Sequence, residues 1–129
     1  MEYYGYIYKT THIPSGKFYI GKKAYKHKKK KKLTKKELAA ITTKGRKPKY
    51  KTEYVDSGWQ TYYGSSKELL ADIEKFGKDE FKVEKIKDCL SRKSLSYWEV
   101  YYMFQYDVLR NDTYNGNILG RFYRRDIVE

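Results

Sequence analysis

A tyrosine-rich stretch near the N-terminus, residues 3–23, constrains the fold more than any other part of the chain. Its first half has the period of a β-strand, and one face of that strand would carry Tyr4, Tyr6, Tyr8 and Thr10. Residues 13–16, Ile-Pro-Ser-Gly, have turn chemistry, and residues 17–21 combine β-branched and aromatic residues as a returning strand does. This pattern predicts a β-hairpin. Because two bare strands are marginally stable in water, the hairpin must pair or pack with other elements.

The remaining elements predict an α+β fold, a small and mainly antiparallel three-stranded sheet flanked by helices. Ser65 or Ser66 can begin a first helix that runs to about residue 76 and stops at Gly77. Residues 80–88 read as the third strand. A second helix over 94–109, with Ser94 as its cap, would present an apolar stripe of Leu95, Trp98, Tyr102 and Tyr106.

The positive charge is concentrated in one segment. Residues 22–51 carry 15 Lys and Arg against one acid, whereas the other 99 residues have a net charge of −1. Such a block repels itself and calls for an anionic partner, for which nucleic acid is the first candidate and an anionic membrane a distant second.

Residues 22–61 are predicted to be a long basic insertion after the second strand. The lysine run 28–32 would be extended or irregular, and the capping box of Thr34 and Glu37 predicts a short helix over 35–41. Residues 42–54 read as a loop, and a connection this long favours a binding function.

The size of the chain, 129 residues, indicates a single domain over 1–129 with a C-terminal tail at 118–129. Cys89 is the one cysteine, so no disulfide framework can form within the chain. The sequence has no apolar run of membrane-spanning length and no signal-peptide core, and we therefore expect a cytoplasmic protein with no membrane partner.

Four features in order carry a family resemblance. Tyr6-Ile7-Tyr8 and Tyr19-Ile20-Gly21 are followed by Tyr63-Gly64-Ser65-Ser66, by Glu99 on a helix and by Tyr114-Asn115. Over residues 3–117 this series resembles the GIY-YIG nucleases, and it is closest in character to small phage-encoded members related to homing endonucleases. One departure is that the first signature glycine is replaced by Tyr6, with Gly5 one place earlier.

The resemblance implies a hydrolytic role for two tyrosines. Tyr8 would deprotonate or orient the attacking water, with Tyr19 hydrogen-bonded nearby. A phenol has a pKa of about 10, so a base near neutrality needs a pKa lowered by a few units, and Lys22 with the basic insertion would favour the phenolate. A covalent phosphotyrosine route remains an alternative.

Glu99 is the metal ligand that the resemblance implies. A single carboxylate suits Mg²⁺, which retains several waters and needs one or two protein oxygens; Mn²⁺ is a second candidate. Arg46, assisted by Lys22 or Lys23, would grip the scissile phosphate, because a guanidinium binds phosphate in a fork. Asn115 would steady the backbone of the site.

Double-stranded DNA is the expected partner, and lysines of the insertion would contact its phosphates. The predicted DNA-binding residues are Lys23, Lys28, Lys29, Lys30, Lys31, Lys32, Lys35, Lys36, Lys44 and Lys47, with Trp59 and Tyr62. These two aromatic residues would either stack on a base or pack beneath the insertion.

The prediction is a metal-dependent DNA endonuclease of homing type, with Tyr8, Tyr19, Lys22, Arg46, Glu99 and Asn115 in its active site. A restriction or host-DNA-degrading nuclease would use a similar core. An alternative from another class is a basic nucleic-acid-binding protein without catalysis, and a third is a family member that has lost activity. The sequence leaves open whether the protein is a monomer or a homodimer.

Overall fold

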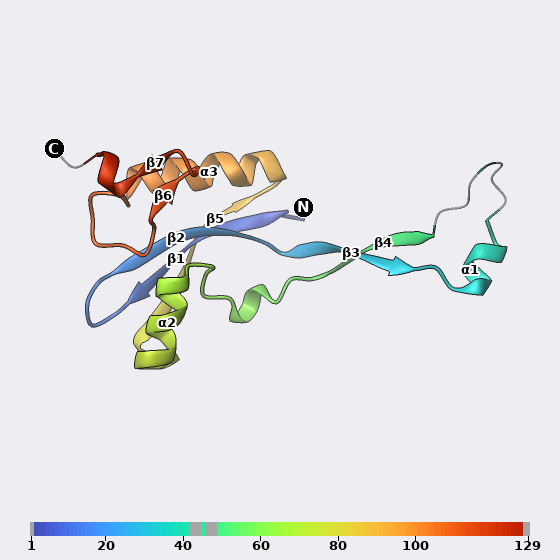
Figure 1. Cartoon of the computed structure of the whole chain (residues 1–129), viewed down its shortest axis with the longest axis horizontal. Helices are drawn as coiled ribbons and strands as arrows, with labels where there is room; N and C mark the ends of the chain where they lie inside the picture. Colours follow the sequence, from blue (N-terminus) through green and yellow to red (C-terminus); the bar gives the residue numbers. More distant parts are fainter. Residues whose placement is uncertain (1, 42–44, 46–48, 128–129) are drawn as a thin grey trace.

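The computed structural model describes residues 2–41, 45 and 49–127, and its elements form an α+β fold (Figure 1). A three-stranded antiparallel sheet in the order β2-β1-β5 lies at the centre of the main body. Its strands are β1 (Gly5–His12), β2 (Phe18–Ala24) and β5 (Phe81–Cys89). The predicted hairpin and third strand are confirmed, and β1 is the central strand because both of the others pair with it.

Alternation along β1 gives the sheet two chemically different faces. Ile7 is buried on one face, whereas Tyr6 and Tyr8 are buried on the other. The register places Tyr8 opposite Gly21 on β2 and shifts relative to β5 between Ile7 and Tyr8. A β-bulge of this kind increases the local twist of a strand, and here it falls at the tyrosine of the first signature.

Helix α3 (Arg92–Gln105) packs on the Ile7 face of the sheet. The buried residues between them are Ile7, Ile20, Cys89, Leu95, Met103, Val108, Leu109 and Ile118. The predicted cap was wrong, because Ser91 begins the helix by accepting a hydrogen bond from the Ser94 backbone N–H at 3.1 Å. The helix also ends before Leu109, since Asp107 has a φ of 52°, which an α-helix does not accommodate.

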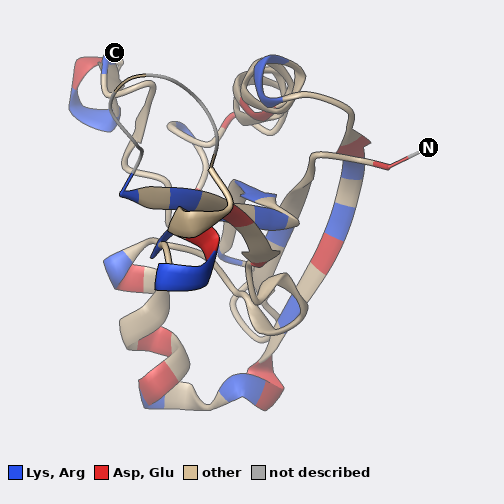
Figure 2. Ribbon diagram, turned by 90° about the vertical axis from the view of Figure 1, so that its right-hand side faces the viewer, with Lys and Arg blue, Asp and Glu red and all other residues tan. Residues whose placement is uncertain are grey.

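Helix α2 (Lys67–Phe76) lies on the opposite side of the sheet (Figures 1 and 2). Ser66 caps it by accepting from Leu69 N–H at 3.3 Å, and Gly77 ends it with a φ of 92°. Both of these predictions are confirmed. Leu69 and Ile73 pack with residues of the strands and of the C-terminal segment in a second, smaller core cluster.

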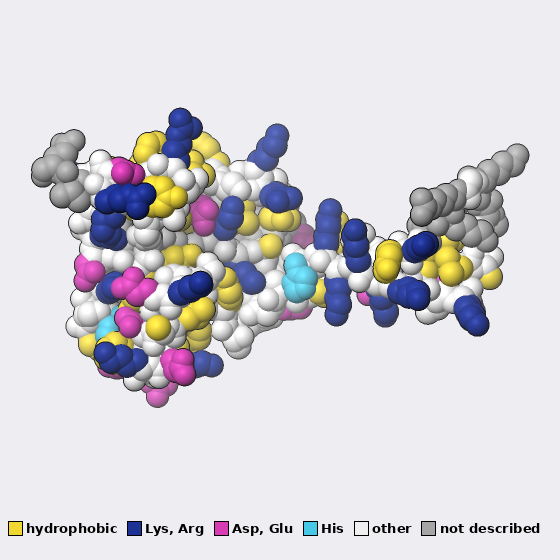
Figure 3. Space-filling view, in the orientation of Figure 1, with side chains coloured by type: hydrophobic (Ala, Val, Ile, Leu, Met, Phe, Trp, Pro, Cys, Tyr) yellow, Lys and Arg dark blue, Asp and Glu magenta, His cyan; other side chains and the backbone are white. Residues whose placement is uncertain are grey.

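The basic segment forms a ribbon that projects from the main body (Figure 1). Strands β3 (Lys26–Lys32) and β4 (Tyr50–Asp56) pair antiparallel, and α1 (Lys35–Ala39) lies at their far end. Lys and Arg side chains line this projecting arm in the space-filling view (Figure 3). The predicted capping box is confirmed, since Thr34 Oγ1 accepts from Glu37 N–H at 3.2 Å and Glu37 accepts from Thr34 N–H at 3.3 Å.

The loop predicted over residues 42–54 is wrong for its last part, because residues 50–54 belong to β4 and pair with the lysine run. Residues 42–44 and 46–48 lie outside the described residues. That residues 22–61 form an insertion stays a prediction; the segment begins within β2 and continues through the ribbon to the turn η1 (Trp59–Thr61).

The C-terminal segment packs on the main body. Its elements are β6 (Asn117–Ile118), β7 (Phe122–Tyr123) and the 3₁₀ turn η3 (Arg124–Asp126); another such turn, η2 (Lys78–Glu80), precedes β5. The Arg124 guanidinium donates to the carbonyls of Val108 and Asn115, each at 3.1 Å. This guanidinium thereby ties the end of the chain to the segment that carries Asn115. None of the helices in the described part of the chain has the length and apolar character that crossing a bilayer requires.

Candidate active site

Five of the candidate residues lie at or beside β2, an edge strand of the sheet: Tyr8, Tyr19, Lys22, Glu99 and Asn115. The Tyr8 ring crosses from the central strand over Gly21 and is 1% exposed. A Cβ atom added to Gly21 would lie 2.5 Å from the Tyr8 hydroxyl oxygen and 2.7 Å from Cε2 of Tyr19. The second signature therefore needs its glycine to make room for both tyrosines.

Tyr19 stands beside Tyr8, with the ring centroids 6.2 Å apart. Its hydroxyl is hydrogen-bonded to Ser65 Oγ at 3.1 Å, at the approach to α2. Gly64 allows this approach, since a Cβ atom at this position would lie 3.1 Å from the Tyr19 ring. The φ of Gly64 is also 145°, a conformation that residues with a side chain rarely adopt. The two signatures and the later Gly-Ser feature thus meet at one place.

Glu99 reaches the same edge from α3. Its carboxylate lies 3.7 Å from the Lys22 ammonium and its side chain is 17% exposed, whereas that of Lys22 is 42% exposed. Lys22 also donates to Ser96 Oγ at 3.1 Å. The Glu99 carboxylate is therefore half-buried, and the Lys22 ammonium that opposes its charge lies on the solvent side.

The two signature phenols of the site favour their protonated forms. Burial raises the pKa of Tyr8 well above its ordinary value of 10.0, and Tyr19, Tyr62 and Glu99 act in the same direction. Burial likewise raises the pKa of Tyr19. The lowered pKa expected for Tyr8 is wrong for the free protein, because Lys22 faces Glu99 and desolvation of the phenol dominates.

Asn115 supports the backbone of β2 between the two signature residues Tyr19 and Gly21. Its Oδ1 accepts from Ile20 N–H and its Nδ2 donates to Ile20 C=O, both at 2.9 Å, and the residue is 4% exposed. A side-chain amide thus completes the pairing that an edge strand otherwise lacks.

The model of the family described as "Putative endonuclease segE, GIY-YIG domain" matches residues 1–127. The chain belongs to the GIY-YIG nuclease family. No curated protein and no solved structure matches it.

At the candidate edge of this GIY-YIG nuclease, Glu99 offers the carboxylate oxygen that a hard cation would need. The described residues contain no group of three or more His, Cys, Asp or Glu that could form a protein-only metal cage. Burial raises the pKa of Glu99 although Lys22 opposes this, so its negative charge is incompletely compensated. A cation would stabilise that charge, and Mg²⁺ needs only one or two protein oxygens.

Two of the predicted DNA contacts pack within the nuclease. The ring of Trp59 lies 4.9 Å from that of Tyr25, and its carbonyl accepts from the Tyr6 hydroxyl at 3.2 Å. The ring of Tyr62 lies 5.9 Å from that of Tyr8, with the Lys23 ammonium 4.1 Å from its centroid. Both aromatic residues line the tyrosine-bearing face of the sheet.

The other predicted lysines that the structure describes, those of β3 and α1, lie apart from this cluster. Arg46, Lys44 and Lys47 fall outside the described residues. The lysines of residues 28–32 are on β3 and those at 35 and 36 are on α1, in the projecting arm (Figure 1).

Sequence reasoning assigned no active-site role to Ser65 or Ser96, which hold Tyr19 and Lys22. Ser65 belongs to a feature that the resemblance did include. For Ser96, the only signal was its place three residues before Glu99, which puts both side chains on one helix face.

Proposed function

We propose that this GIY-YIG nuclease is a metal-dependent endonuclease that hydrolyses phosphodiester bonds in double-stranded DNA. One observation carries the proposal: Tyr8, Tyr19, Lys22 and Glu99 meet at the β2 edge, held by Gly21 and Asn115. Two phenols, an ammonium and a carboxylate at one edge can position a phosphate, a water molecule and a cation together.

Tyr8 has the task of orienting the attacking water. Burial keeps its hydroxyl protonated near neutrality, and a protonated phenol both accepts and donates a hydrogen bond. Tyr19 limits the positions available to that hydroxyl through its adjacent ring and is itself held by Ser65. A misplaced water would slow the reaction, because correct positioning of the reacting groups lowers the activation free energy by several kcal/mol, on the order of 7–11 in favourable cases.

Glu99 is the residue proposed to hold Mg²⁺, with Mn²⁺ as a substitute. When bound, the cation would supply positive charge against the charge that develops on the scissile phosphate. The Lys22 ammonium, which is partly exposed and 3.7 Å from Glu99, would bind a phosphate oxygen from the solvent side. Arg46 remains part of the proposal as a second phosphate ligand.

The lysines of the ribbon and of α1, with Lys23, are proposed to bind the DNA backbone. Lys28, Lys30 and Lys32 are exposed, and phosphate contacts of this kind make affinity fall steeply with salt. The proposal includes a homing-type role, in which cleavage is restricted to a few sites.

The test is cleavage of supercoiled plasmid with and without Mg²⁺. We expect the wild type to relax or linearise the plasmid, and Glu99→Gln and Tyr8→Phe to lose at least about 100-fold in rate, as loss of a positioning or charge-stabilising group typically does. Glu84→Gln and Tyr97→Phe are matched controls, since both side chains are exposed, and they should cleave normally.

The wild type and the variants also separate the alternatives. Salt-sensitive DNA binding without cleavage by any of them would overturn the nuclease assignment in favour of a binding protein. Discrete fragments from the wild type fit a homing or restriction role, whereas a continuous smear indicates degradation. Binding of Mn²⁺, followed by electron paramagnetic resonance, should weaken in Glu99→Gln whether or not DNA is cut.

A further inference from the structure

The two faces of the β3–β4 ribbon differ in chemistry. Directly paired residues of antiparallel strands point to the same side, and the register pairs Lys28 with Tyr54, Lys30 with Thr52 and Lys32 with Tyr50. We call these six residues the tyrosine face. The opposite face consists of His27, Lys29, Lys31, Lys51, Glu53 and Val55.

Acidic side chains compensate the middle of the opposite face. Lys51 lies 2.6 Å from Glu37 of α1 and 3.4 Å from Glu53. Its side chain and that of Glu53 are partly covered. On the side of the tyrosine face the one acid of the two strands is Asp56 at the base of the ribbon, which pairs with Lys26 in the register and accepts from Gly58 N–H at 2.7 Å. No acid is paired with Lys28, Lys30 or Lys32 in the register, so their positive charge is available to an external anion.

The tyrosine face also presents aromatic rings to solvent. Tyr50 is 57% exposed and Tyr54 is 64% exposed. Large exposed aromatic side chains beside uncompensated lysines are unusual for a merely solvated surface, because exposed apolar patches rimmed by polar residues mark interaction sites. The combination suits a partner with both phosphates and flat or methyl-bearing bases.

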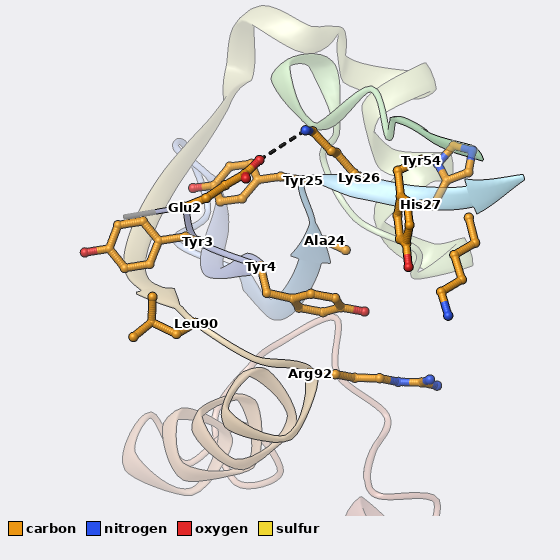
Figure 4. Close-up of a pocket in the computed structure, with 11 residues that line it drawn as sticks. Glu2, Tyr3, Tyr4, Ala24, Tyr25, Lys26, His27, Tyr54, Leu90 and Arg92 are labelled. Atoms are coloured by element: carbon orange, nitrogen blue, oxygen red, sulfur yellow. Dashed lines mark hydrogen bonds and ion pairs between the residues drawn. The ribbon is translucent and has the colours of Figure 1, made fainter. Parts of the chain in front are cut away.

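The tyrosine face continues into a cavity at the base of the ribbon. Tyr54 and Lys28 line this cavity, whose volume is about 790 Å³, together with Tyr4 and Arg92 (Figure 4). Arg92 begins α3 and points into the same space as Tyr4 (Figure 4). The surface thus runs from the tip of the ribbon to the main body and has a cation at each end.

We infer that the tyrosine face enters the major groove of duplex DNA and reads its bases. The inference rests on the proposed function for the identity of the partner. Seven residues per strand at about 3.4 Å each span roughly 20 Å, and the major groove, about 12 Å wide, admits a two-stranded ribbon. Tyr50, Thr52 and Tyr54 are the residues that determine sequence specificity. Lys28, Lys30 and Lys32, which lie beside them on β3, bind the DNA backbone and fix the position of the ribbon along the duplex.

The test compares two double variants that remove equal charge. Lys28→Ala/Lys30→Ala changes the tyrosine face, and Lys29→Ala/Lys31→Ala changes the opposite face. Affinity for a labelled duplex is measured by fluorescence anisotropy in EDTA, so that cleavage plays no part. We expect the tyrosine-face variant to lose at least about tenfold more affinity than its counterpart; equal losses would overturn the inference and indicate binding through total charge alone.

Base reading needs a second measurement. Duplexes are selected from a randomised library by the wild type and by Tyr50→Ala/Thr52→Ala. We expect the wild type to enrich a defined sequence and the variant to lose that enrichment. No enrichment by the wild type, or an identical sequence from both proteins, would overturn the inference.

Groove choice is tested by competition. Methyl green, which occupies the major groove, should displace the protein, whereas distamycin in the minor groove should not; the reverse result would refute major-groove entry. If the wild type binds no duplex at all, the proposed function fails with this inference. If it binds but treats the two faces alike, only the inference fails.

Discussion

Asn115 links the stability of the protein to the geometry of its site, and its replacement by Ala is therefore informative. The substitution leaves Ile20 N–H and C=O without the two hydrogen bonds of 2.9 Å, at a position where Asn115 is 4% and Ile20 is 0% exposed. An unpaired buried polar group costs about 1–3 kcal/mol. We expect the unfolding free energy to fall by roughly 2–4 kcal/mol, which lowers Tm by about 10 °C for a domain of this size.

Thermal denaturation followed by circular dichroism measures this loss. The matched control is Asn117→Ala, because Asn117 Oδ1 also accepts from a backbone N–H, that of Gly120 at 2.8 Å, but in an exposed turn. We expect the control to lose about 0.5 kcal/mol or less. Equal losses in the two variants would refute the reasoning. Cleavage by Asn115→Ala should also be slow at temperatures where the variant is fully folded, since the backbone between Tyr19 and Gly21 loses its support.

Two further predictions concern the same site, and a third concerns the lysines of the ribbon. Gly21→Ala should abolish most cleavage, because the added Cβ would lie 2.5 Å from the Tyr8 hydroxyl oxygen and displace it. The control Gly116→Ala should cleave normally, since a Cβ there would have no neighbour within 4 Å. Normal cleavage by Gly21→Ala would contradict this reasoning. Glu99→Gln should be more stable than the wild type at pH 7. In the wild type, burial raises the pKa of the Glu99 carboxyl above 4.5. The folded wild type therefore binds this proton more tightly than the unfolded chain does, and it loses stability as pH rises through the folded pKa. Thermal denaturation should show this advantage at pH 7 and its disappearance below about pH 4; a less stable variant at pH 7 would refute it. Duplex binding should weaken steeply between about 50 and 200 mM salt, and a flat anisotropy titration would contradict the backbone contacts.

The elements that sequence reasoning predicted well have local signals. The hairpin has period-two alternation with a Pro-Ser-Gly turn, and α2 lies between Ser66 and Gly77, which begin and end it in the structure. The start of α3 was less determinate, because Ser91 and Ser94 have the same capping chemistry three residues apart. Leu95 belongs to the helix and packs against the sheet whichever of the two serines is the N-cap, so its apolar character does not identify the cap.

Strand β4 had no comparable signal. Its partner is a run of five lysines, which has no apolar alternation to indicate pairing. Backbone hydrogen bonds pair the two strands of the ribbon, and no residue of either strand belongs to a core cluster of the described residues. The raised pKa of Tyr8 was equally unpredictable, since it depends on the rings of Tyr19 and Tyr62 and on burial that only the folded chain creates.

The location of the site follows from how the chain covers the edge of β2. An edge strand has a row of unpaired backbone groups. Between Phe18 and Ile20 these groups bind the segment 113–115, through Tyr114 N–H to Phe18 C=O at 2.8 Å and through Asn115. From Lys22 onward the edge faces Ser96 and Glu99 of α3 instead. Tyr8, passing over Gly21, brings its hydroxyl to the boundary between these two stretches. The backbone is therefore rigid on one side of the tyrosine hydroxyl, while charged and partly exposed side chains lie on the other, where a phosphate can approach.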